Sequence, residues 1–587
     1  MKSTIITWTL LTFFLIAAGS VALAQNAGKD QAAGCPIHFA VIGDRTGGHV
    51  AGIYEEIVSN VERLRPDFVV NVGDMIEGYS TDTTVLKNQW EEYKKIISPL
   101  TMPVYMTPGN HDITYDAALG MFERYVGKPY HSFDVKGLHF IVLDNSRWES
   151  SAELPKEQLD WLAADLKEHQ NARYIFVLHH KPFWYNSTAD NRPDTLHTLF
   201  RNFGVDAVIT GHFHDYFSGK FDSIFYTGMG SSGGDAPIGP TGLQYHFLWV
   251  TVDDKGISIV PVKLGSVLPW EELTVAEEKF IEKMNRQGVS FVSPMAIGSK
   301  LELLDSVVTI KLKNFHPDID WEDTIKWEVP QGWQVTPADL PIKISKGDSA
   351  LASFGIRHEG KLFPTPTSSV RFPYATGKFS AIQQMLPVQR EIRIGQATSS
   401  PTIDGAIEKS AWGEATSNLF NPEGGVMTVD STFFYFAYDK NNLYLGAICQ
   451  ERKIDSLTAN VTERDGAIYA EDCVGYFLQP DLGKKVVYQL YFNPRGAIFD
   501  QKITEETGGN LVSDRNWNGK YDVKTTKGTD YWSIEIKVPL AQFDVSARAK
   551  DQMGLNFRRK QFRLQSAADW QVPLVGDPKA LGKMVLF

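Results

Sequence analysis

Short apolar runs alternate with amphipathic stretches over the first half of the sequence. Apolar side chains recur at 3.6-residue spacing in stretches 54–63, 86–97 and 156–168 and after Asp194, which predicts four helices. Repeated strand, loop and helix over residues 36–265 imply a largely parallel sheet. Two hairpin-like pairs, at 131–143 and 245–262, interrupt this alternation. We therefore predict a mixed, layered α/β sandwich.

Polar residues suited to metal binding follow five apolar runs of this region. The runs cover 39–42, 68–72, 104–106, 174–178 and 207–209, and they are followed by Gly43-Asp44, Gly73-Asp74, Pro108-Gly109-Asn110-His111-Asp112, His179-His180 and Gly211-His212-Phe213-His214. A plain turn explains Gly and Asn at such positions, but it does not explain their recurrence with His and Asp. Ligands of open α/β sheets bind outside the carboxyl ends of the strands. Carboxylates combined with imidazoles suit divalent first-row ions, so we expect a metal site at one rim.

Beyond residue 265 the pattern becomes that of a β protein. Residues 266–294 predict a connector with one helix, over 274–285. Residues 295–395 contain short alternating strands separated by Gly, Pro and Asp, which predicts an Ig-like β-sandwich. A β-rich segment, 397–587, follows. Twelve of the 14 histidines precede residue 250, so the chemistry is expected in the first region.

Length, charge and the N-terminal pattern limit the class of protein. A chain of 587 residues is expected to form about three to four domains. Its net charge of −12 argues against a nucleic-acid-binding face. One Lys, an apolar run over 5–18 and Ala22-Leu23-Ala24 predict a signal peptide over 1–24. No later run is long enough to span a bilayer, so we expect an exported protein that is periplasmic, cell-surface or extracellular. Of three cysteines, Cys449 and Cys473 could form a disulfide, which the sequence leaves open.

The motifs GD, GD, GNHD, HH and GHFH, in this order, resemble those of calcineurin-like metallophosphoesterases. The resemblance covers residues 36–265 and implies two divalent or first-row transition metal ions, Mn, Fe or Zn. It implies that Asp74 bridges both ions, that Asp44 and His214 bind one, and that Asn110, His180 and His212 bind the other. A metal-bridging hydroxide would attack the phosphorus of a phosphate mono- or diester. His111 would protonate the leaving group, oriented by Asp112.

The first motif departs from the family pattern. The family writes Asp-x-His, whereas this chain has Asp44-Arg45-Thr46. Either Glu77, Tyr79, His49 or water replaces the missing ligand, or the first ion binds weakly, and the sequence does not rank these alternatives. Arg45 is expected either to bind a substrate phosphate, because its planar fork suits phosphate, or to form a surface salt bridge. The resemblance implies His180 rather than His179 as ligand, because the family's ligand commonly lies two residues before a Pro, here Pro182. Strand alternation also points His179 in the opposite direction.

Further segments are candidates for the rim of this site. Residues 145–147 follow another strand, and 184–185 come just after His180. The Gly-rich segment 228–242 reads as a plain loop or as a mobile lip over the site.

The last segment resembles family 9 carbohydrate-binding modules. The resemblance rests on Pro401-Thr402-Ile403-Asp404-Gly405 with Trp412, on Tyr438-Asp439 followed by Asn442-Leu443-Tyr444-Leu445, and on later strand motifs up to Leu581-Gly582-Lys583. It implies a C-terminal β-sandwich in which aromatic faces bind sugar rings. Trp517, Trp570 and Tyr469 are the candidate sugar-binding residues, with ordinary packing as the alternative.

Two functions are compatible with these patterns. The first is an exported dinuclear-metal phosphoesterase, tethered to a polysaccharide or cell-surface glycan by its last module. The second is a surface or glycan-binding protein whose phosphoesterase domain is degenerate and inactive, an interpretation suggested by Thr46.

Overall fold

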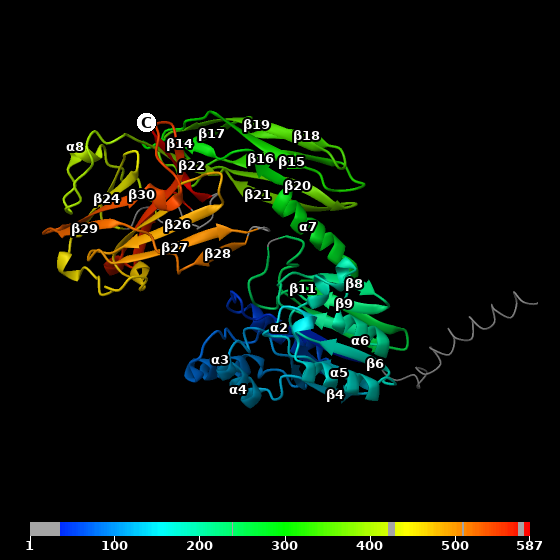
Figure 1. Ribbon diagram of the computed structural model, residues 1–587. Coiled ribbons are helices and arrows are strands. Elements are labelled where there is room, and N and C mark those ends of the chain that lie inside the picture. Colours follow the sequence, from blue (N-terminus) through cyan, green and yellow to red (C-terminus); the bar gives the residue numbers. More distant parts are fainter. Residues whose placement is uncertain (1–35, 238, 264, 421–428, 507–509, 573–579) are drawn as a thin grey trace, which may run out of the picture. The chain divides into compact units, whose positions relative to one another are not determined.

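The computed structural model describes residues 36–237, 239–263, 265–420, 429–506, 510–572 and 580–587 (Figure 1). The predicted signal peptide over 1–24 lies outside these residues. The chain divides into two compact units, one made of 1–283 with 374–380 and the other of 284–373 with 381–587. No helix in the described ranges has both the length and the apolar composition of a membrane span.

The first unit contains two six-stranded mixed sheets. One has the order β12 (Ser266–Val267), β11 (Gly256–Lys263), β10 (His246–Asp253), β1 (Ile37–Ile42), β2 (Phe68–Asn71) and β3 (Val104–Met106). The other has the order β4 (His131–Val135), β5 (Leu138–Val142), β6 (Tyr174–Leu178), β7 (Ala207–Thr210), β9 (Ile224–Gly228) and β8 (Phe217–Phe221). Strands β1, β2 and β3 are parallel, as are β5, β6, β7 and β9. The metal-binding motifs therefore follow parallel strands of two sheets rather than of one.

Aromatic side chains fill the space between the two sheets. Phe39 of β1 meets Phe140 of β5 and Phe176 of β6 edge to face, with ring centroids 5.4 and 5.3 Å apart. Such edge-to-face pairs are a favourable aromatic geometry. At the carboxyl ends of the strands, His180 after β6 is hydrogen-bonded to the Val72 carbonyl after β2, and the His212 amide after β7 donates to Asp44 after β1.

Helices cover the outer face of each sheet, where the amphipathic pattern predicts them. Helices α2 (Ile53–Leu64), α3 (Thr83–Ile97) and α4 (Asp116–Tyr125) share a core with the first sheet, and α5 (Lys156–Glu168) and α6 (Thr195–Phe203) share one with the second. Asp194 caps α6 by accepting a 2.8 Å hydrogen bond from the backbone of His197. The prediction of a layered α/β sandwich in this region is confirmed.

The second unit is rich in β-structure. Two four-stranded sheets contain β13 (Val289–Phe291), β15 (Val307–Lys313), β19 (Ser349–His358) and β17 (Trp333–Thr336), and β18 (Asp339–Ile344), β16 (Trp321–Glu328), β20 (Thr367–Ala375) and β21 (Lys378–Met385). A nine-stranded sheet contains β14 (Met295–Ile297), β22 (Val388–Ile394), β33 (Gly582–Leu586), β31 (Gln552–Gln561), β25 (Cys473–Gln479), β26 (Val486–Phe492), β27 (Ile498–Glu505), β28 (Leu511–Asp514) and β32 (Ser566–Asp569). A further sheet contains β23 (Thr432–Tyr438), β24 (Asn442–Gln450), β30 (Tyr531–Pro539) and β29 (Asp522–Lys527).

The predicted boundary near residue 396 does not separate two sheets, because strands from both sides of it belong to the nine-stranded sheet. Strand β22 lies before this boundary, yet it pairs in parallel with β33 at the C-terminus. The connector helix is α7 (Val275–Gln287), and α8 (Lys409–Trp412) is a single turn. The Ig-like identity of the middle segment stays a prediction.

The cysteines of the second unit are not joined. Cys449 and Cys473 are both free and buried. They belong to different hydrophobic clusters, because Cys449 packs with Trp532 whereas Cys473 packs with Phe477. Both therefore serve as small apolar core residues.

A histidine bridges two carboxylates beside the second sheet. His139 of β5 is buried, and its Nδ1 and Nε2 lie 2.9 Å from Asp134 and 2.8 Å from Asp165. Its ring stacks on His169 at 3.8 Å with planes only 10° apart, so a single ion cannot lie in the plane of both rings. Asp134, His139 and His169 therefore form a charge cluster rather than a metal site. Burial alone would lower the pKa of His139, but Asp165 and Asp134 outweigh it and raise the pKa above its ordinary value.

We predict that His139→Gln destabilises this sheet most strongly in mild acid. The raised pKa means that the stabilisation is fully present below about pH 6.5 and is lost as pH rises through the folded-state pKa. Loss of charged hydrogen bonds should cost about 1.5–3 kcal/mol at pH 6 and less at pH 9. Hydrogen exchange of the β4 and β5 amides, compared with wild type at each pH, measures this difference.

His131→Gln is the matched control on the neighbouring strand. Burial lowers the pKa of His131, so its protonation opposes folding and its loss should not weaken the sheet in acid. A His139 effect that is equal at both pH values would contradict the ionic role.

Candidate metal centre

Asp44 and Asp74 occupy the turns that follow β1 and β2. Both have left-handed backbone conformations, with φ of 48° and 58°. This conformation is uncommon for residues other than Gly, and such strain is concentrated at functional sites. The two turns are joined, since the Asp44 amide donates to the Gly73 carbonyl at 3.0 Å. Both carboxylates are buried, with relative exposures of 0% and 2%.

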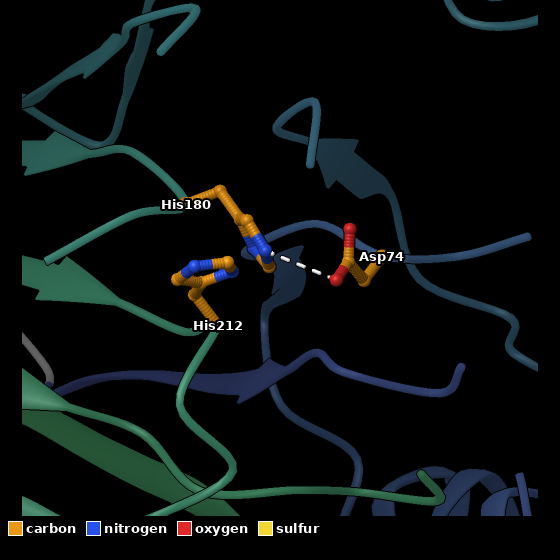
Figure 2. Close-up of side chains that lie close together, drawn as sticks. All are labelled: Asp74, His180 and His212. Carbon is orange, nitrogen blue, oxygen red and sulfur yellow. Dashed lines mark ion pairs between the residues drawn. The ribbon is translucent and has the colours of Figure 1, made fainter. Parts of the chain in front are cut away.

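Asp74, His180 and His212 form one group of donors (Figure 2). Their ligand atoms lie within 4.8 Å of one another, and His180 Nε2 is 3.1 Å from Asp74 Oδ2. Two donors that share an ion at about 2.1 Å from each lie about 3.0–3.4 Å apart. His180 Nδ1 is hydrogen-bonded to the Val72 carbonyl at 2.8 Å, so Nε2 is the nitrogen left for an ion.

Asp44 and His214 form a second group. His214 Nε2 is 3.6 Å from Asp44 Oδ1, and His214 Nδ1 is hydrogen-bonded to the Asp235 carbonyl. The backbone amide of His212 donates to Asp44 Oδ1 at 2.8 Å, which ties this group to the first one. Asp44 and His214 thus lie together, as do Asp74, His180 and His212, and the assignment of these residues to two ions stays a prediction.

Asn110 and His111 lie between these groups and the rim. The His111 amide donates to Asp74 Oδ1 at 2.9 Å, and His111 Nε2 is 4.0 Å from Asp74 Oδ2. His111 Nδ1 is hydrogen-bonded to the Glu77 carbonyl at 2.8 Å. That contact places a proton on Nδ1 and leaves Nε2 facing the carboxylates. The side chain remains 18% exposed, so a substrate can reach it.

Asp112 has a different role from the one predicted. Its carboxylate is buried and accepts four backbone hydrogen bonds of 2.8–3.2 Å, from the amides of Asp74, Met75, Ile76 and Gly109. It therefore joins the β2 and β3 turns, and the Glu77 carbonyl rather than Asp112 orients His111. Burial, followed by the charge of Asp74, raises the pKa of Asp112 to about 7.

Two buried oxygens of the site indicate that the residues fit a metal. Asp44 Oδ2 and Asn110 Oδ1 are buried and have no hydrogen-bond partner among the described residues. Leaving such atoms unpaired is costly, and a cation beside each oxygen would satisfy it. Gly109 makes room for the carboxylate, since a Cβ there would lie 2.1 Å from Asp74 Oδ1. Carboxylate, amide and imidazole donors together suit Mn, Fe or Zn.

The electrostatics of the centre keep Asp74 ionised. Burial alone would raise the pKa of Asp74, but the charges of His180 and His111 outweigh it and lower the pKa. His180 shows the reciprocal effect, because Asp74 overcomes burial and raises the pKa of His180 to about 9. Burial, followed by the charge of His180, lowers the pKa of His212 to about 3, so this imidazole is neutral and able to ligate.

Arg45 does not face the centre as a free phosphate ligand. It is only 5% exposed, and it donates to the Met75 carbonyl at 3.1 Å and to Glu92 at 2.6 Å. The prediction of a substrate-binding Arg45 is therefore corrected in favour of the salt bridge.

The residues considered as replacements for the missing histidine lie at the rim. His49 and Glu77 are hydrogen-bonded to each other at 2.9 Å, whereas Tyr79 contacts Asn110. None of the three is hydrogen-bonded to Asp44 within the described ranges. Thr46 itself is fully buried.

Two further residues, Asn145 and Ser231, hold turns of the site in place. Asn145 accepts hydrogen bonds of 3.1 Å from the amides of His180 and Lys181, and so fixes the turn after β6. Ser231 donates to the Asp44 carbonyl at 2.9 Å from within the Gly-rich segment. Residues 229–234 are buried, so this part of the segment is a packed wall rather than a mobile lip. The position of Asn145 after a strand marked it as a candidate for the rim, whereas no sequence signal distinguished Ser231 within the Gly-rich segment.

Of the remaining candidates, His179, Trp184 and Tyr185 point into protein. His179 is buried, with Nδ1 2.9 Å from the Lys181 carbonyl, which agrees with the choice of His180 as ligand. Trp184 and Tyr185 belong to the core beneath the second sheet.

Residues 37–216 match the family described as calcineurin-like phosphoesterase. The chain contains a calcineurin-like metallophosphoesterase domain. It is 26% identical over 208 residues to purple acid phosphatase 22 of Arabidopsis thaliana, an alignment that covers 31% of this chain and 45% of the plant protein. It is also 26% identical to a probable cyclic nucleotide phosphodiesterase of Pseudoalteromonas sp., over 31% of this chain and 69% of that protein. The chain thus spans about half the length of the plant relative.

A family 9 carbohydrate-binding module from Caldicellulosiruptor kristjanssonii, in complex with cellotriose, is similar to a third of the chain. It is 16% identical, covers 33% of this chain and 93% of that chain, and has a TM-score of 0.25. The similarity is weak, and a sugar-binding C-terminal module stays a prediction.

The structure corrects part of the predicted sugar site. Trp570 is fully buried and stacks on Phe557 at 5.1 Å, so it is a core residue. Trp517 is partly buried against Tyr488, with ring centroids 4.6 Å apart. Tyr469 is the one of the three candidates that is largely exposed, at 43%.

We predict that Asp112→Asn lowers metal binding as well as stability. In either orientation the amide would present its NH2 group to two backbone amides that now donate to the carboxylate, at a cost of about 1–3 kcal/mol for each unsatisfied group. Metal content after loading with Mn²⁺ and the melting temperature measure the two effects.

Asp116→Asn provides the control, since its side chain is 97% exposed and contacts Arg147 at the surface. If Asp112→Asn kept its metal and lost turnover only with poor leaving groups, the carboxylate would act through His111 instead.

Proposed function

We propose that this protein is a dinuclear-metal phosphoesterase that hydrolyses a phosphate mono- or diester. The observation that carries the proposal is the pair of donor groups at the strand ends: Asp44 with His214, and Asp74 with His180 and His212. Asn110, whose Oδ1 is buried without a partner among the described residues, is assigned to the second group in this proposal. The phosphatase and phosphodiesterase relatives support the same reaction class.

The roles of the residues follow from their contacts. When bound, the two ions supply an acidic water as nucleophile and positive charge for the phosphoryl oxygens. Asp74 contacts His180 at 3.1 Å and is an electrostatic neighbour of Asp44, and it is the bridging ligand in this proposal. His111, held through Nδ1 by the Glu77 carbonyl, presents Nε2 to the leaving group and donates a proton there.

The second candidate function is a binding protein with an inactive phosphoesterase domain. The observation in its favour is that Thr46 replaces a ligand, while His49 and Glu77 are paired with each other rather than with Asp44. The first donor set then offers only Asp44, Asp74 and His214.

We further propose that the protein is exported and held at a glycan or cell surface. The apolar run over 5–18 with its small-residue site supports export. Exposed Tyr469, against the edge of Phe499, is the aromatic surface best suited to a sugar ring.

Metal dependence separates the two functions. We expect hydrolysis of a chromogenic phosphomonoester or phosphodiester to require Mn²⁺, Zn²⁺ or iron, to stop with a chelator, and to return on adding metal. Absence of turnover with every metal, in a protein that is folded by circular dichroism, would favour the inactive binding protein.

We expect His111→Ala to lower turnover by about 10²–10⁴-fold for esters with poor leaving groups and by much less for nitrophenyl esters. A good leaving group departs without protonation, so it does not need the acid. Steady-state kinetics with leaving groups of graded pKa test this difference. His38→Ala, at the opposite end of β1 from Asp44, is the control. Equal losses for all leaving groups would rule out His111 as the acid.

A further inference from the structure

Asn110 can ligate an ion only in one orientation of its amide. Its Oδ1 is buried without a hydrogen-bond partner among the described residues, and its Nδ2 donates to the Tyr79 hydroxyl at 2.9 Å. A carbonyl oxygen binds a cation, whereas an NH2 group offers no lone pair to one. The hydrogen bond to Tyr79 therefore determines that Oδ1 is the buried, unpaired end of the amide. The residues on either side of Asn110 contact Asp74, since the His111 amide donates to Asp74 Oδ1 and Gly109 lies against the same carboxylate.

The backbone around Tyr79 is held in an uncommon conformation. Gly78 and Tyr79 are both left-handed, with φ of 59° and 46°. A Cβ at residue 78 would lie 1.7 Å from the His111 carbonyl, so only Gly fits there. The Gly78 amide donates to Gln89 at 3.0 Å, which anchors the segment on α3. The strain therefore brings the Tyr79 side chain over the β3 turn.

The ring of Tyr79 also contacts His111. The two rings meet edge to face, with centroids 4.7 Å apart and planes at 85°. The neighbouring Glu77 carbonyl accepts from His111 Nδ1, so one short segment restrains the imidazole by a hydrogen bond and by a ring contact. The ring remains 55% exposed, which leaves it at the mouth of the site.

We propose that Tyr79 is a positioning residue that orients Asn110 toward the second ion through its hydroxyl and supports His111 through its ring. This proposal rests on the proposed function, because the role of Asn110 as metal ligand and the role of His111 as general acid both come from it. Tyr79 acts by accepting a hydrogen bond from Asn110 rather than by replacing the missing ligand of the first ion. Loss of a hydrogen-bonding partner of a metal ligand lowers metal affinity by about 10–100-fold.

Calorimetric titration of Mn²⁺ into the chelator-treated full-length protein tests whether the Tyr79 hydroxyl contributes to metal affinity. Tyr79→Phe removes the hydroxyl and keeps the ring, so we expect affinity for one of two ions to fall about 10–100-fold, with the other unchanged. Tyr115→Phe, which alters another exposed tyrosine near the same turn, should leave both affinities unchanged. Equal affinities in Tyr79→Phe and wild type would overturn the proposal even if the wild type hydrolyses phosphoesters.

A double-mutant cycle with Asn110→Asp isolates the orienting role. A carboxylate presents an oxygen in either orientation, so Tyr79→Phe should have little effect on Mn²⁺ affinity in the Asn110→Asp background. A tenfold or greater loss in that background would contradict the orienting role. An Fe³⁺-loaded wild type with a visible phenolate-to-iron absorption band that Tyr79→Phe abolishes would show direct ligation and also overturn it.

The ring is tested separately by turnover. Tyr79→Leu removes the ring contact with His111, so its turnover should fall further for esters with poor leaving groups than for esters with good ones. Tyr79→Phe keeps the ring, so its loss of turnover should not depend on the leaving group. If the wild type bound two Mn²⁺ ions but hydrolysed no phosphoester, the proposed function would be refuted. The Mn²⁺ affinity of Tyr79→Phe would still decide whether Tyr79 positions Asn110. A wild type that binds no Mn²⁺ would refute both.

Discussion

The carboxylate of Asp74 is the group on which the rest of the site depends. It pairs with His180 at 3.1 Å and accepts the His111 amide at 2.9 Å, so it links the turns after β2, β3 and β6. Its own backbone is held by the buried Asp112. A buried, ionised carboxylate is costly unless positive charge and donors surround it. The convergence of these turns satisfies that requirement, and a cation would satisfy it further.

Strain and buried polar groups are concentrated at this one place. Asp44, Asp74, His212 and His214 all have positive φ values. Conformations of this kind persist where surrounding contacts determine them, and here the contacts are hydrogen bonds between turns. Two hydrophobic cores, each formed where α-helices pack on one of the sheets, give these turns rigid support. The packing of the two sheets and their helices thus keeps these four residues in backbone conformations that are unfavourable by themselves.

Two corrections share one physical cause. Arg45 and Asp112 both belong to the conspicuous motifs, and both proved to be structural, one paired with Glu92 and the other bonded to backbone amides. Short polar motifs contain residues that build the turn as well as residues that face the ligand. Sequence spacing does not separate the two kinds, because each turn buries some side chains and exposes others. Trp570 in the second unit was misassigned for the same reason, since its burial depends on Phe557.

The sequence by itself determined the strand and helix pattern of the first region and the set of residue types at the strand ends, because periodicity and turn chemistry are local. The family resemblance around Pro182, together with strand alternation, also indicated His180 over His179. Only the tertiary structure decided that two sheets rather than one supply the turns, that Glu77 orients His111, and that Tyr79 contacts Asn110. These contacts join residues 31 and 34 positions apart in the chain, and their geometry depends on how separately formed elements pack together.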